Sequence, residues 1–128
     1  MVQVTFYGRR SAWAARTTEL SDAVHRTLTG EWGIPEAKRF HRFVLLDDTE
    51  IVAPSRGPGY LVVQIVCFSG RSHAAVRRLL HAFTDDVVPA LGLPVDDLEV
   101  VVIESPPSHW GIRGMIGDEL ALDYRVEI

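Results

Sequence analysis

Hydrophobic residues occur along the chain in short segments that predict strands. Residues 2–7 alternate and are rich in β-branched side chains, and residues 40–46 and 98–104 are also typical of strands. Residues 60–68 are almost continuously apolar, which is typical of a strand covered on both faces. A final stretch, residues 121–128, predicts a short closing strand.

Two amphipathic segments between these strands predict helices. Ser11 is a suitable N-cap for the first helix, whose apolar face extends to Trp32. Ser72 is a suitable N-cap for the second helix, in which apolar residues recur at helical spacing as far as Leu91. Pro89 lies near the end of this second helix, and we expect it to kink or loosen the last turn.

The order of the elements is repeated, and so are the short motifs that bound the helices. These motifs are Gly8-Arg9 and Gly70-Arg71 before the helices, and Gly33-Ile34-Pro35 and Gly92-Leu93-Pro94 after them. The repeat predicts one α+β domain over residues 1–128, built from β-α-β units at residues 1–46 and 60–104. The strands of each unit should be parallel, which gives a four-stranded sheet with two helices on one face.

The second face of such a sheet has no helices to cover it. Hydrophobic residues make up 47% of the chain, toward the apolar end for its length. Identical subunits are the simplest cover for an apolar face, which predicts a homo-oligomer. The alternative is a ferredoxin-like module, which also contains two β-α-β units. A solution mass near that of two subunits would favour this alternative.

Charge and cysteine content exclude several classes of protein. Seventeen acidic and thirteen basic residues give a net charge of −4, so the chain lacks the basic surface of a protein that binds nucleic acid or an anionic membrane. Cys67 is the single cysteine and the histidines lack metal-ligand spacing, so we expect no disulfide, no metal and no cofactor. The expected location is the cytoplasm, because no signal peptide or apolar run of roughly 20 residues is present.

Six motifs occur along the chain in a specific order: Asp22-Ala23-Val24-His25, Gly33-Ile34-Pro35, Arg39-Phe40, Phe68-Ser69-Gly70-Arg71-Ser72, Leu91-Gly92-Leu93-Pro94 and Trp110-Gly111-Ile112-Arg113-Gly114. Together they resemble the tautomerase superfamily, and within it the branch around malonate semialdehyde decarboxylase. The resemblance implies a β-α-β fold that forms a homotrimer, with active sites at subunit boundaries near the amino terminus. It also implies small 2-oxo, enol or 3-halo acids as substrates, an amino-terminal proline as general base or acid, and arginines that hold the substrate carboxylate.

The chain departs from this family at its amino terminus, because it begins with Met1-Val2 and lacks the proline. A terminal amine, which ordinarily titrates near pH ~7.7 to 8.0, is still able to act as a base or to form an imine. Retention of Met1 moves that amine about 3.3 Å along the strand. Met1 and Val2 are therefore candidate catalytic residues.

Lys38, the only lysine, occupies the place where the resemblance implies an aspartate that positions or activates water. Water activation by a carboxylate is therefore not expected at this place. Lys38 is instead a candidate catalytic residue, as a Schiff-base nucleophile or as an anchor for a carboxylate. The alternative is a solvated loop residue.

Arg71 is a candidate for both catalysis and substrate binding. It lies at the start of the second helix, where backbone N–H groups and the helix dipole favour an anion, while Ser69 replaces the second arginine of the family pair. The alternative is an arginine that pairs with a nearby acid. Arg39 is a further candidate for binding the substrate carboxylate.

Four more residues are candidates through the resemblance. His25 matches a histidine that cis-3-chloroacrylic acid dehalogenase uses beside its proline, although a histidine with apolar flanks is also typical of packing. Trp110 and Ile112 align with an aromatic pair that forms a pocket wall, and Arg113 is placed to add charge at the pocket mouth. An interface anchor is the alternative for Trp110.

These residues favour two hypotheses about function. The first is weak or altered tautomerase-type activity on a small 2-oxo or enol carboxylate, in which arginines hold the anion while the terminal amine, His25 or Lys38 moves a proton. The second is a non-catalytic trimer that binds a small anionic metabolite or has only a structural role.

Overall fold

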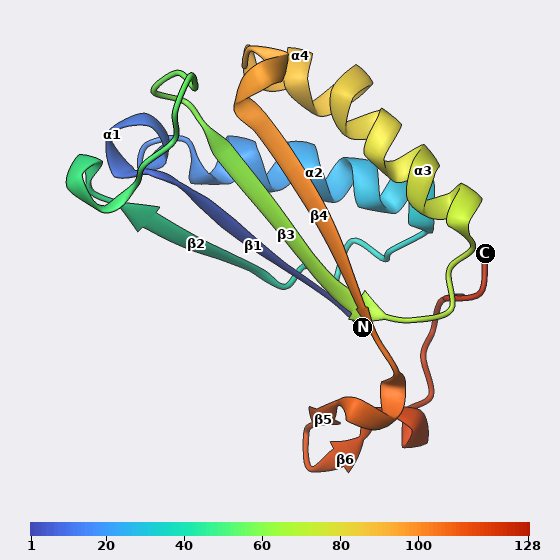
Figure 1. Cartoon of the computed structure of the whole chain (residues 1–128). Helices are drawn as coiled ribbons and strands as arrows, with labels where there is room; N and C mark the ends of the chain where they lie inside the picture. Colours follow the sequence, from blue (N-terminus) through green and yellow to red (C-terminus); the bar gives the residue numbers. More distant parts are fainter.

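The computed structural model describes residues 1–128, which form a four-stranded mixed sheet with helices (Figure 1). The strands are β1 (Val2–Arg9), β2 (His41–Leu46), β3 (Leu61–Phe68) and β4 (Leu98–Ser105), in the spatial order β2-β1-β3-β4. β1 is parallel to β2 and β3 is parallel to β4, while β1 and β3 pair antiparallel at the centre. The expected four-stranded sheet with parallel pairs is confirmed.

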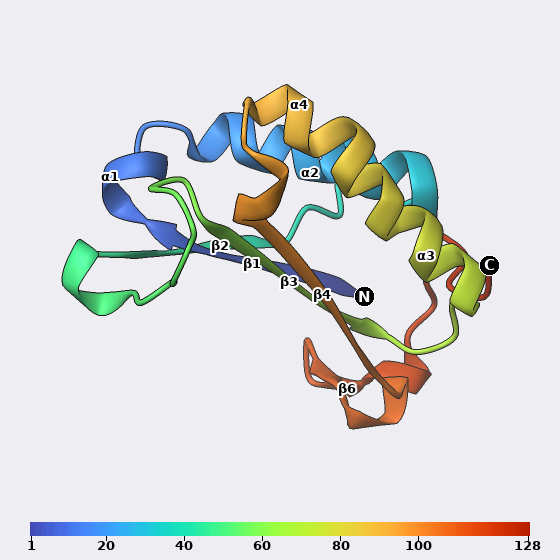
Figure 2. The ribbon, with the colours of Figure 1, turned by 45° about the horizontal axis from the view of Figure 1, so that its top comes forward.

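The helices lie together on one face of the sheet, as Figure 2 shows. They are α1 (Arg10–Trp13), α2 (Thr17–Trp32), α3 (His73–Ala82), a π-helical turn (Phe83–Val87) and α4 (Val88–Leu91). Short 3₁₀ turns occupy Asp48–Glu50, Val95–Asp97, Pro107–His109 and Gly117–Glu119. None of the helices combines the length and the apolar character that a membrane span requires.

The first helical region is divided in two. The predicted single helix from Ser11 to Trp32 is wrong, because α1 ends at Trp13 and α2 begins only at Thr17. The buried indole of Trp13 lies over Gly8, where a Cβ atom would come within 2.7 Å of the ring. Glycine leaves room for this contact, which holds Trp13 against the sheet while the chain turns toward α2. Ser11 lies inside α1 and caps nothing.

The second helical region begins as predicted. The side chain of Ser72 accepts a hydrogen bond from the backbone N–H of Ala75 at 3.1 Å. Pro89 has no N–H group to donate to the preceding turn, and the helix widens into its π turn just before α4, which contains this proline. The expected loosening near Pro89 is confirmed.

The carboxyl-terminal segment contains a small hairpin and then irregular chain. Residues 121–128 form no strand, so the predicted closing strand is wrong. After the hairpin of β5 (Gly111–Ile112) and β6 (Met115–Ile116), the chain returns past the start of α3, where the N–H of Ser72 donates to the backbone oxygen of Ile128 at 3.0 Å. The carboxyl-terminal segment therefore lies beside the end of a helix, where no strand edge is available for pairing.

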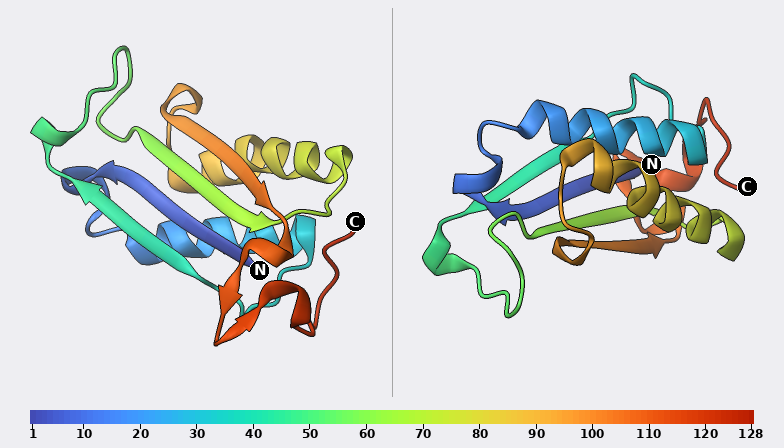
Figure 3. Two further views of the ribbon diagram at one scale, coloured as in Figure 1. Left: turned by 60° about the horizontal axis from the view of Figure 1, so that its bottom comes forward. Right: turned by 90° about the horizontal axis from the view of Figure 1, so that it is seen from above.

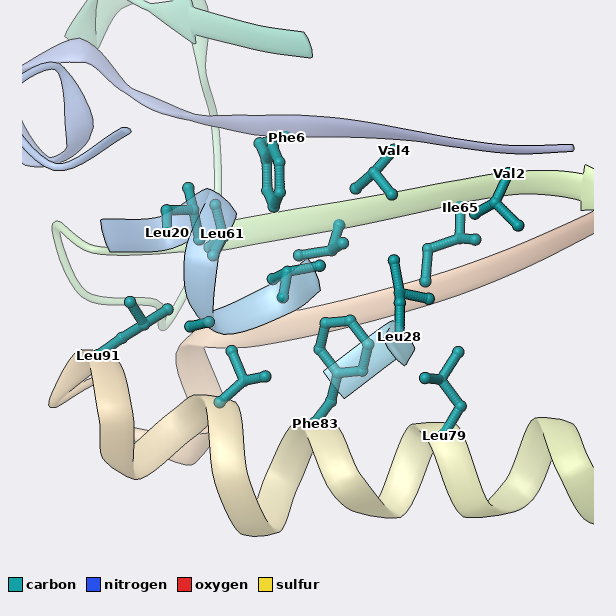
Figure 4. Close-up of a cluster of buried hydrophobic side chains, with 14 of the residues drawn as sticks. Val2, Val4, Phe6, Leu20, Leu28, Leu61, Ile65, Leu79, Phe83 and Leu91 are labelled. Carbon is teal, nitrogen blue, oxygen red and sulfur yellow. The ribbon is translucent and has the colours of Figure 1, made fainter. Parts of the chain in front are cut away.

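The hydrophobic core lies between the sheet and the helices (Figure 4). Alternate residues of the two central strands point into it and meet leucine and phenylalanine side chains of the helices. The labelled examples are Val2, Val4, Phe6, Leu61 and Ile65 from the strands and Leu20, Leu28, Leu79, Phe83 and Leu91 from the helices. The alternation of burial along β1 and β3 agrees with this arrangement.

The opposite face of the sheet has no helices over it, as the left view of Figure 3 shows. The register places Val44, Val101 and Ile103 on this face. Their partners on the neighbouring strands are Tyr7, Gln64 and Val66, which lie on the same face. Val44, Val101 and Ile103 are 38%, 43% and 41% exposed. The predicted bare face is therefore present and partly apolar.

Replacing Val63 by alanine should lower the free energy of unfolding by about 2 kcal/mol, because two methyl carbons leave a fully buried site and a cavity remains. The matched control is Val52→Ala, since Val52 is 89% exposed, and its effect should stay within about 0.5 kcal/mol. Urea denaturation followed by circular dichroism measures both values. An equal decrease in the free energy of unfolding of the two variants would contradict the placement of Val63 in the core.

Candidate active site

A cavity of about 130 Å³ opens at the amino end of β1. Three parts of the chain meet there: the start of β1, the segment that leads into β2, and the region from β5 to the carboxyl terminus (Figure 3). The lining comprises Met1, Val2, Lys38, Phe40, Ile112, Arg113, Leu120, Leu122 and Tyr124. Five of these are predicted site residues, namely Met1, Val2, Lys38, Ile112 and Arg113, and the fold brings them together.

The terminal amine of Met1 lies at this cavity in a poorly solvated position. Its strand is anchored beside the end of β3, because the backbone oxygen of Met1 accepts a hydrogen bond from the N–H of Phe68 at 3.1 Å. Burial, and then the positive charges of Arg71 and Lys38, lower the pKa of the amine from 8.0 to about 5. The amine is therefore uncharged at neutral pH and able to accept a proton.

Lys38 and Arg113 are the charged side chains of the lining. Arg113 and Gly114 form the two-residue turn of the β5–β6 hairpin, with φ values of 53° and 79°. Positive φ at both central positions is typical of a type I′ turn, and a side chain at such a position costs conformational free energy. The hairpin thus holds a guanidinium at the cavity in spite of that cost.

Arg71 lies close to the amine but does not line the cavity. The residue is only 6% exposed, and its guanidinium carbon is 4.1 Å from the centre of the Trp32 ring. Nη1 donates to the carbonyl of Phe68 at 3.3 Å, whereas Nε and Nη2 have no hydrogen-bond partner. Burial lowers the pKa of Arg71 as well. Direct contact between Arg71 and a substrate stays a prediction, while its charge acts on the amine.

The amino end of α3, where the sequence favours an anion, is already occupied by the chain. The side chain of Ser72 bonds to the N–H of Ala75, and the N–H of Ser72 bonds to the backbone oxygen of Ile128. An anion at this helix end would have to displace the carboxyl-terminal segment. The cavity in front of Met1 is therefore the more accessible place for a ligand.

Four of the lining residues are not among those that the sequence predicts for the site: Phe40, Leu120, Leu122 and Tyr124. The last three occur at every second position, and this spacing is the signal that they share one side of the chain. Burial raises the pKa of Tyr124, so its phenol stays protonated at neutral pH. The irregular carboxyl-terminal segment therefore forms one apolar wall of the cavity.

Trp110 supports this wall without forming it. Its ring packs edge to face on Phe68, with the ring centres 5.2 Å apart. The backbone carbonyl of Trp110 accepts a hydrogen bond from Gly117 at 2.8 Å, and a Cβ atom on Gly117 would come within 2.4 Å of the carbonyl oxygen of Pro107. These contacts fasten the hairpin beside the sheet, which places Ile112 and Arg113.

His25 and Arg39 lie away from the cavity. His25 is fully buried on α2, and its Nε2 is 3.2 Å from the backbone oxygen of Pro35. Arg39 forms ion pairs with Asp22 and Glu36. The surroundings of His25 are those of a packing residue, and the guanidinium of Arg39 is already paired. Their predicted contacts with substrate stay predictions.

The arrangement suits a small anion that has an apolar part. Seven of the nine lining residues are hydrophobic and the other two are cations, while an uncharged amine faces the same space. A carboxylate can pair with the cations while its hydrocarbon part contacts the walls. The side chains of His, Cys, Asp and Glu form no group of three that could hold a metal ion.

Comparison with known proteins identifies the family. Residues 38–113, more than half of the chain, match the family model described as tautomerase enzyme. The chain therefore belongs to the tautomerase enzyme family, which confirms the resemblance in its sequence motifs.

Two curated tautomerases share sequence with the chain. A probable tautomerase of Ralstonia nicotianae is 32% identical over 54 residues, which cover 42% of this chain and 77% of the relative. The 2-hydroxymuconate tautomerase of Pseudomonas putida is 32% identical over 57 residues, which cover 44% of this chain and 90% of the relative.

Solved structures of related fold cover nearly the whole chain. Malonate semialdehyde decarboxylase has a TM-score of 0.80 at 19% identity, covering 93% of this chain and 99% of that one. Native fused 4-OT has a TM-score of 0.81 at 20% identity, covering 92% of this chain and 98% of that one. These likenesses establish the tautomerase fold, which excludes the ferredoxin-like alternative.

The pKa of the Met1 amine should be measurable near 5 and should depend on Arg71. In Arg71→Met we expect the pKa to rise toward 8.0, because a repulsive cation is removed while burial still lowers the value. The exposed residue Arg77 on α3 supplies the control, Arg77→Met, in which the pKa should not change. Nuclear magnetic resonance of the Met1 α-carbon against pH gives the pKa. A wild-type pKa near 8.0, or no response to Arg71→Met, would contradict this environment.

Proposed function

We propose that this protein is a tautomerase that acts on a small 2-oxo or enol carboxylate through the amine of Met1. The observation that carries the proposal is an apolar cavity that brings Met1, Lys38 and Arg113 together. Burial lowers the pKa of the Met1 amine there to about 5, which favours its uncharged form at neutral pH. The two curated relatives, a probable tautomerase and a 2-hydroxymuconate tautomerase, support the same class of reaction. This chemistry uses the amine in place of the amino-terminal proline that the resemblance implies.

In the proposed reaction the substrate carboxylate pairs with Lys38 and Arg113. The amine accepts the proton of the enol hydroxyl group as the carbon–oxygen bond becomes a carbonyl. The ammonium then delivers that proton to the neighbouring carbon, which completes the keto form and regenerates the amine. One proton relay and one anion clamp are sufficient, so the reaction needs no activated water.

The lining favours isomerisation over reactions that use water. It contains no aspartate or glutamate, so no carboxylate lies there to activate a water molecule. Malonate semialdehyde decarboxylase is described as having decarboxylase and hydratase activities, and it shares the fold at 19% identity. Lys38 stands where the resemblance to that branch implies an aspartate. We therefore expect an activity that differs from that of the decarboxylase.

We also propose that three copies assemble through the open face of the sheet. Val44, Val101 and Ile103 leave apolar surface on this face, which a partner subunit would remove from water. A fused 4-OT with a TM-score of 0.80 is described as an asymmetric trimer. Assembly through this face would leave the helices on the outside.

Purified protein should convert phenylenolpyruvate or 2-hydroxymuconate to the keto form faster than buffer does. Because only the uncharged amine accepts a proton, activity should be present above a pH of about 5 and lost as the pH falls through that value. Lys38→Ala should raise KM about tenfold, since a charge-assisted contact is removed. The exposed Arg78→Ala on α3 is the control. The absorbance of the enol reports the rate.

Two outcomes would contradict catalysis by this site. One is no turnover of either enol above the buffer rate, and the other is turnover that Lys38→Ala and Arg113→Ala both leave unchanged. If phenylpyruvate raises the melting temperature of the wild type in a Lys38-dependent manner without any turnover, the non-catalytic, anion-binding trimer is the better description.

The solution mass should be near three times the chain mass of 14.3 kDa. Val101→Asp places a charge on the open face and should shift the mass toward one chain, because burial of an unpaired carboxylate is unfavourable. Val95→Asp is the control, since Val95 is 55% exposed in a 3₁₀ turn outside the sheet. Analytical ultracentrifugation measures the mass, and a value near two chains or one chain in the wild type would contradict the trimer.

A further inference from the structure

Arg39 lies between two residues that line the cavity but does not line it. Lys38 and Phe40 both contact the cavity, whereas the guanidinium of Arg39 turns back toward α2. There it forms ion pairs with Asp22, which belongs to α2, and with Glu36, which belongs to the loop after that helix. One arginine therefore joins the loop that carries Lys38 to the helix behind it.

The Arg39 contacts continue into a network of polar side chains. Nη1 of Arg39 also approaches Oγ of Ser21 at 3.4 Å, and this hydroxyl lies 2.7 Å from Nδ1 of His41. Ser21 is on α2 and His41 is the first residue of β2. The network therefore spans the helix, the loop and the strand that follows the loop.

Other contacts hold the two ends of this loop but leave the side chain of Lys38 free. At one end, Nε2 of His25 contacts the backbone oxygen of Pro35 at 3.2 Å, and the N–H of Lys38 donates to the same oxygen at 2.9 Å. At the other end, the N–H of Val4 donates to the carbonyl of Phe40 at 2.9 Å. The ammonium of Lys38 makes no hydrogen bond or ion pair, so its place depends on the backbone beneath it.

We propose that Arg39 is a positioning residue for the substrate site: paired with Asp22 and Glu36, it fixes the backbone that presents Lys38 and Phe40 to the cavity. This inference rests on the proposed function, because Lys38 is taken to hold the substrate carboxylate. In this proposal Arg39 does not contact the substrate itself. It acts on substrate binding through its two neighbours in the chain, Lys38 and Phe40.

The charges of the three groups agree with this role. Hydrogen bonding to Asp22 and then to Glu36 raises the pKa of Arg39, so the guanidinium stays charged and its charge is offset by two carboxylates. Exposed ion pairs contribute little to global stability, and the Asp22 and Glu36 side chains are 48% and 72% exposed. The expected effect of breaking them is therefore on the position of the loop more than on the stability of the fold.

A comparison of two kinds of variant separates positioning from direct binding. Arg39→Ala removes the guanidinium, whereas Asp22→Ala combined with Glu36→Ala keeps it and removes both carboxylates that hold it. If Arg39 positions the loop, both should weaken binding of phenylpyruvate and raise KM for phenylenolpyruvate by ~10-fold with a smaller change in kcat. If Arg39 binds substrate directly, releasing it should leave KM unchanged or lower it, and this result would overturn the proposal.

A double-mutant cycle with Lys38 supplies the second test. Because Arg39 acts through Lys38, Arg39→Ala should change KM much less in a Lys38→Ala background than in the wild type. Arg39→Lys keeps the positive charge but lacks the planar guanidinium that bonds to two carboxylates at once. It should therefore bind phenylpyruvate better than Arg39→Ala but less well than the wild type. Arg26→Ala is the matched control, since Arg26 is exposed on the same helix and makes no ion pair. Independent, additive effects of Lys38→Ala and Arg39→Ala would overturn the proposal.

Hydrogen exchange tests the positioning without any substrate. The backbone amides of residues 36–40 should exchange faster in Arg39→Ala than in the wild type, while those of β1 and β3 and those of Arg26→Ala should not change. Equal exchange at residues 36–40 overturns the proposal even if the enzyme is active. Faster exchange in a protein that neither binds phenylpyruvate nor turns over phenylenolpyruvate confirms that Arg39 holds the loop and counts against the proposed function instead.

Discussion

The antiparallel pairing of β1 with β3 is the interaction on which the rest of the structure depends. It joins the two β-α-β units into one sheet, from Val2 opposite Cys67 to Gly8 opposite Leu61. The same pairing fixes the register of the two strands, so that alternate side chains of each strand point into the core. Because the two strands run in opposite directions, the start of β1 lies beside the end of β3. The Met1 amine is thereby brought near Arg71, which follows that strand.

The state of the Met1 amine follows first from its burial and then from the positive charges near it. Where positive groups lie close together in a poorly solvated place, the free energy falls when one of them loses its proton, and the group with the lowest ordinary pKa does so first. That group is the amine of Met1, with a pKa lowered from 8.0 to about 5, while Arg71 keeps its charge over the ring of Trp32. The remaining positive charge favours an anionic ligand, so the uncharged state of the amine and the proposed substrate class have the same physical origin.

The three candidate arginines have different surroundings. Arg113 reaches the cavity from a strained hairpin turn, Arg71 lies beneath the surface, and Arg39 is paired with Asp22 and Glu36. Each lies in a motif that resembles the family, and the motifs do not distinguish these surroundings. The direction in which each side chain leaves the backbone decides which cation reaches the cavity. For Arg39 and Arg71 that direction depends on Asp22 and Trp32, which are far away in the sequence.

The sequence by itself determined the four main strands, the Ser72 cap, the disturbance near Pro89 and the family, because each depends on residues close together in the chain or on motif order. It also identified Met1, Lys38 and Arg113 as candidates. Only the tertiary structure decided that the first helix is divided where Trp13 meets Gly8, and that residues 121–128 form a cavity wall in place of a strand. Those outcomes depend on packing between distant segments, which hydrophobic periodicity along the chain does not record.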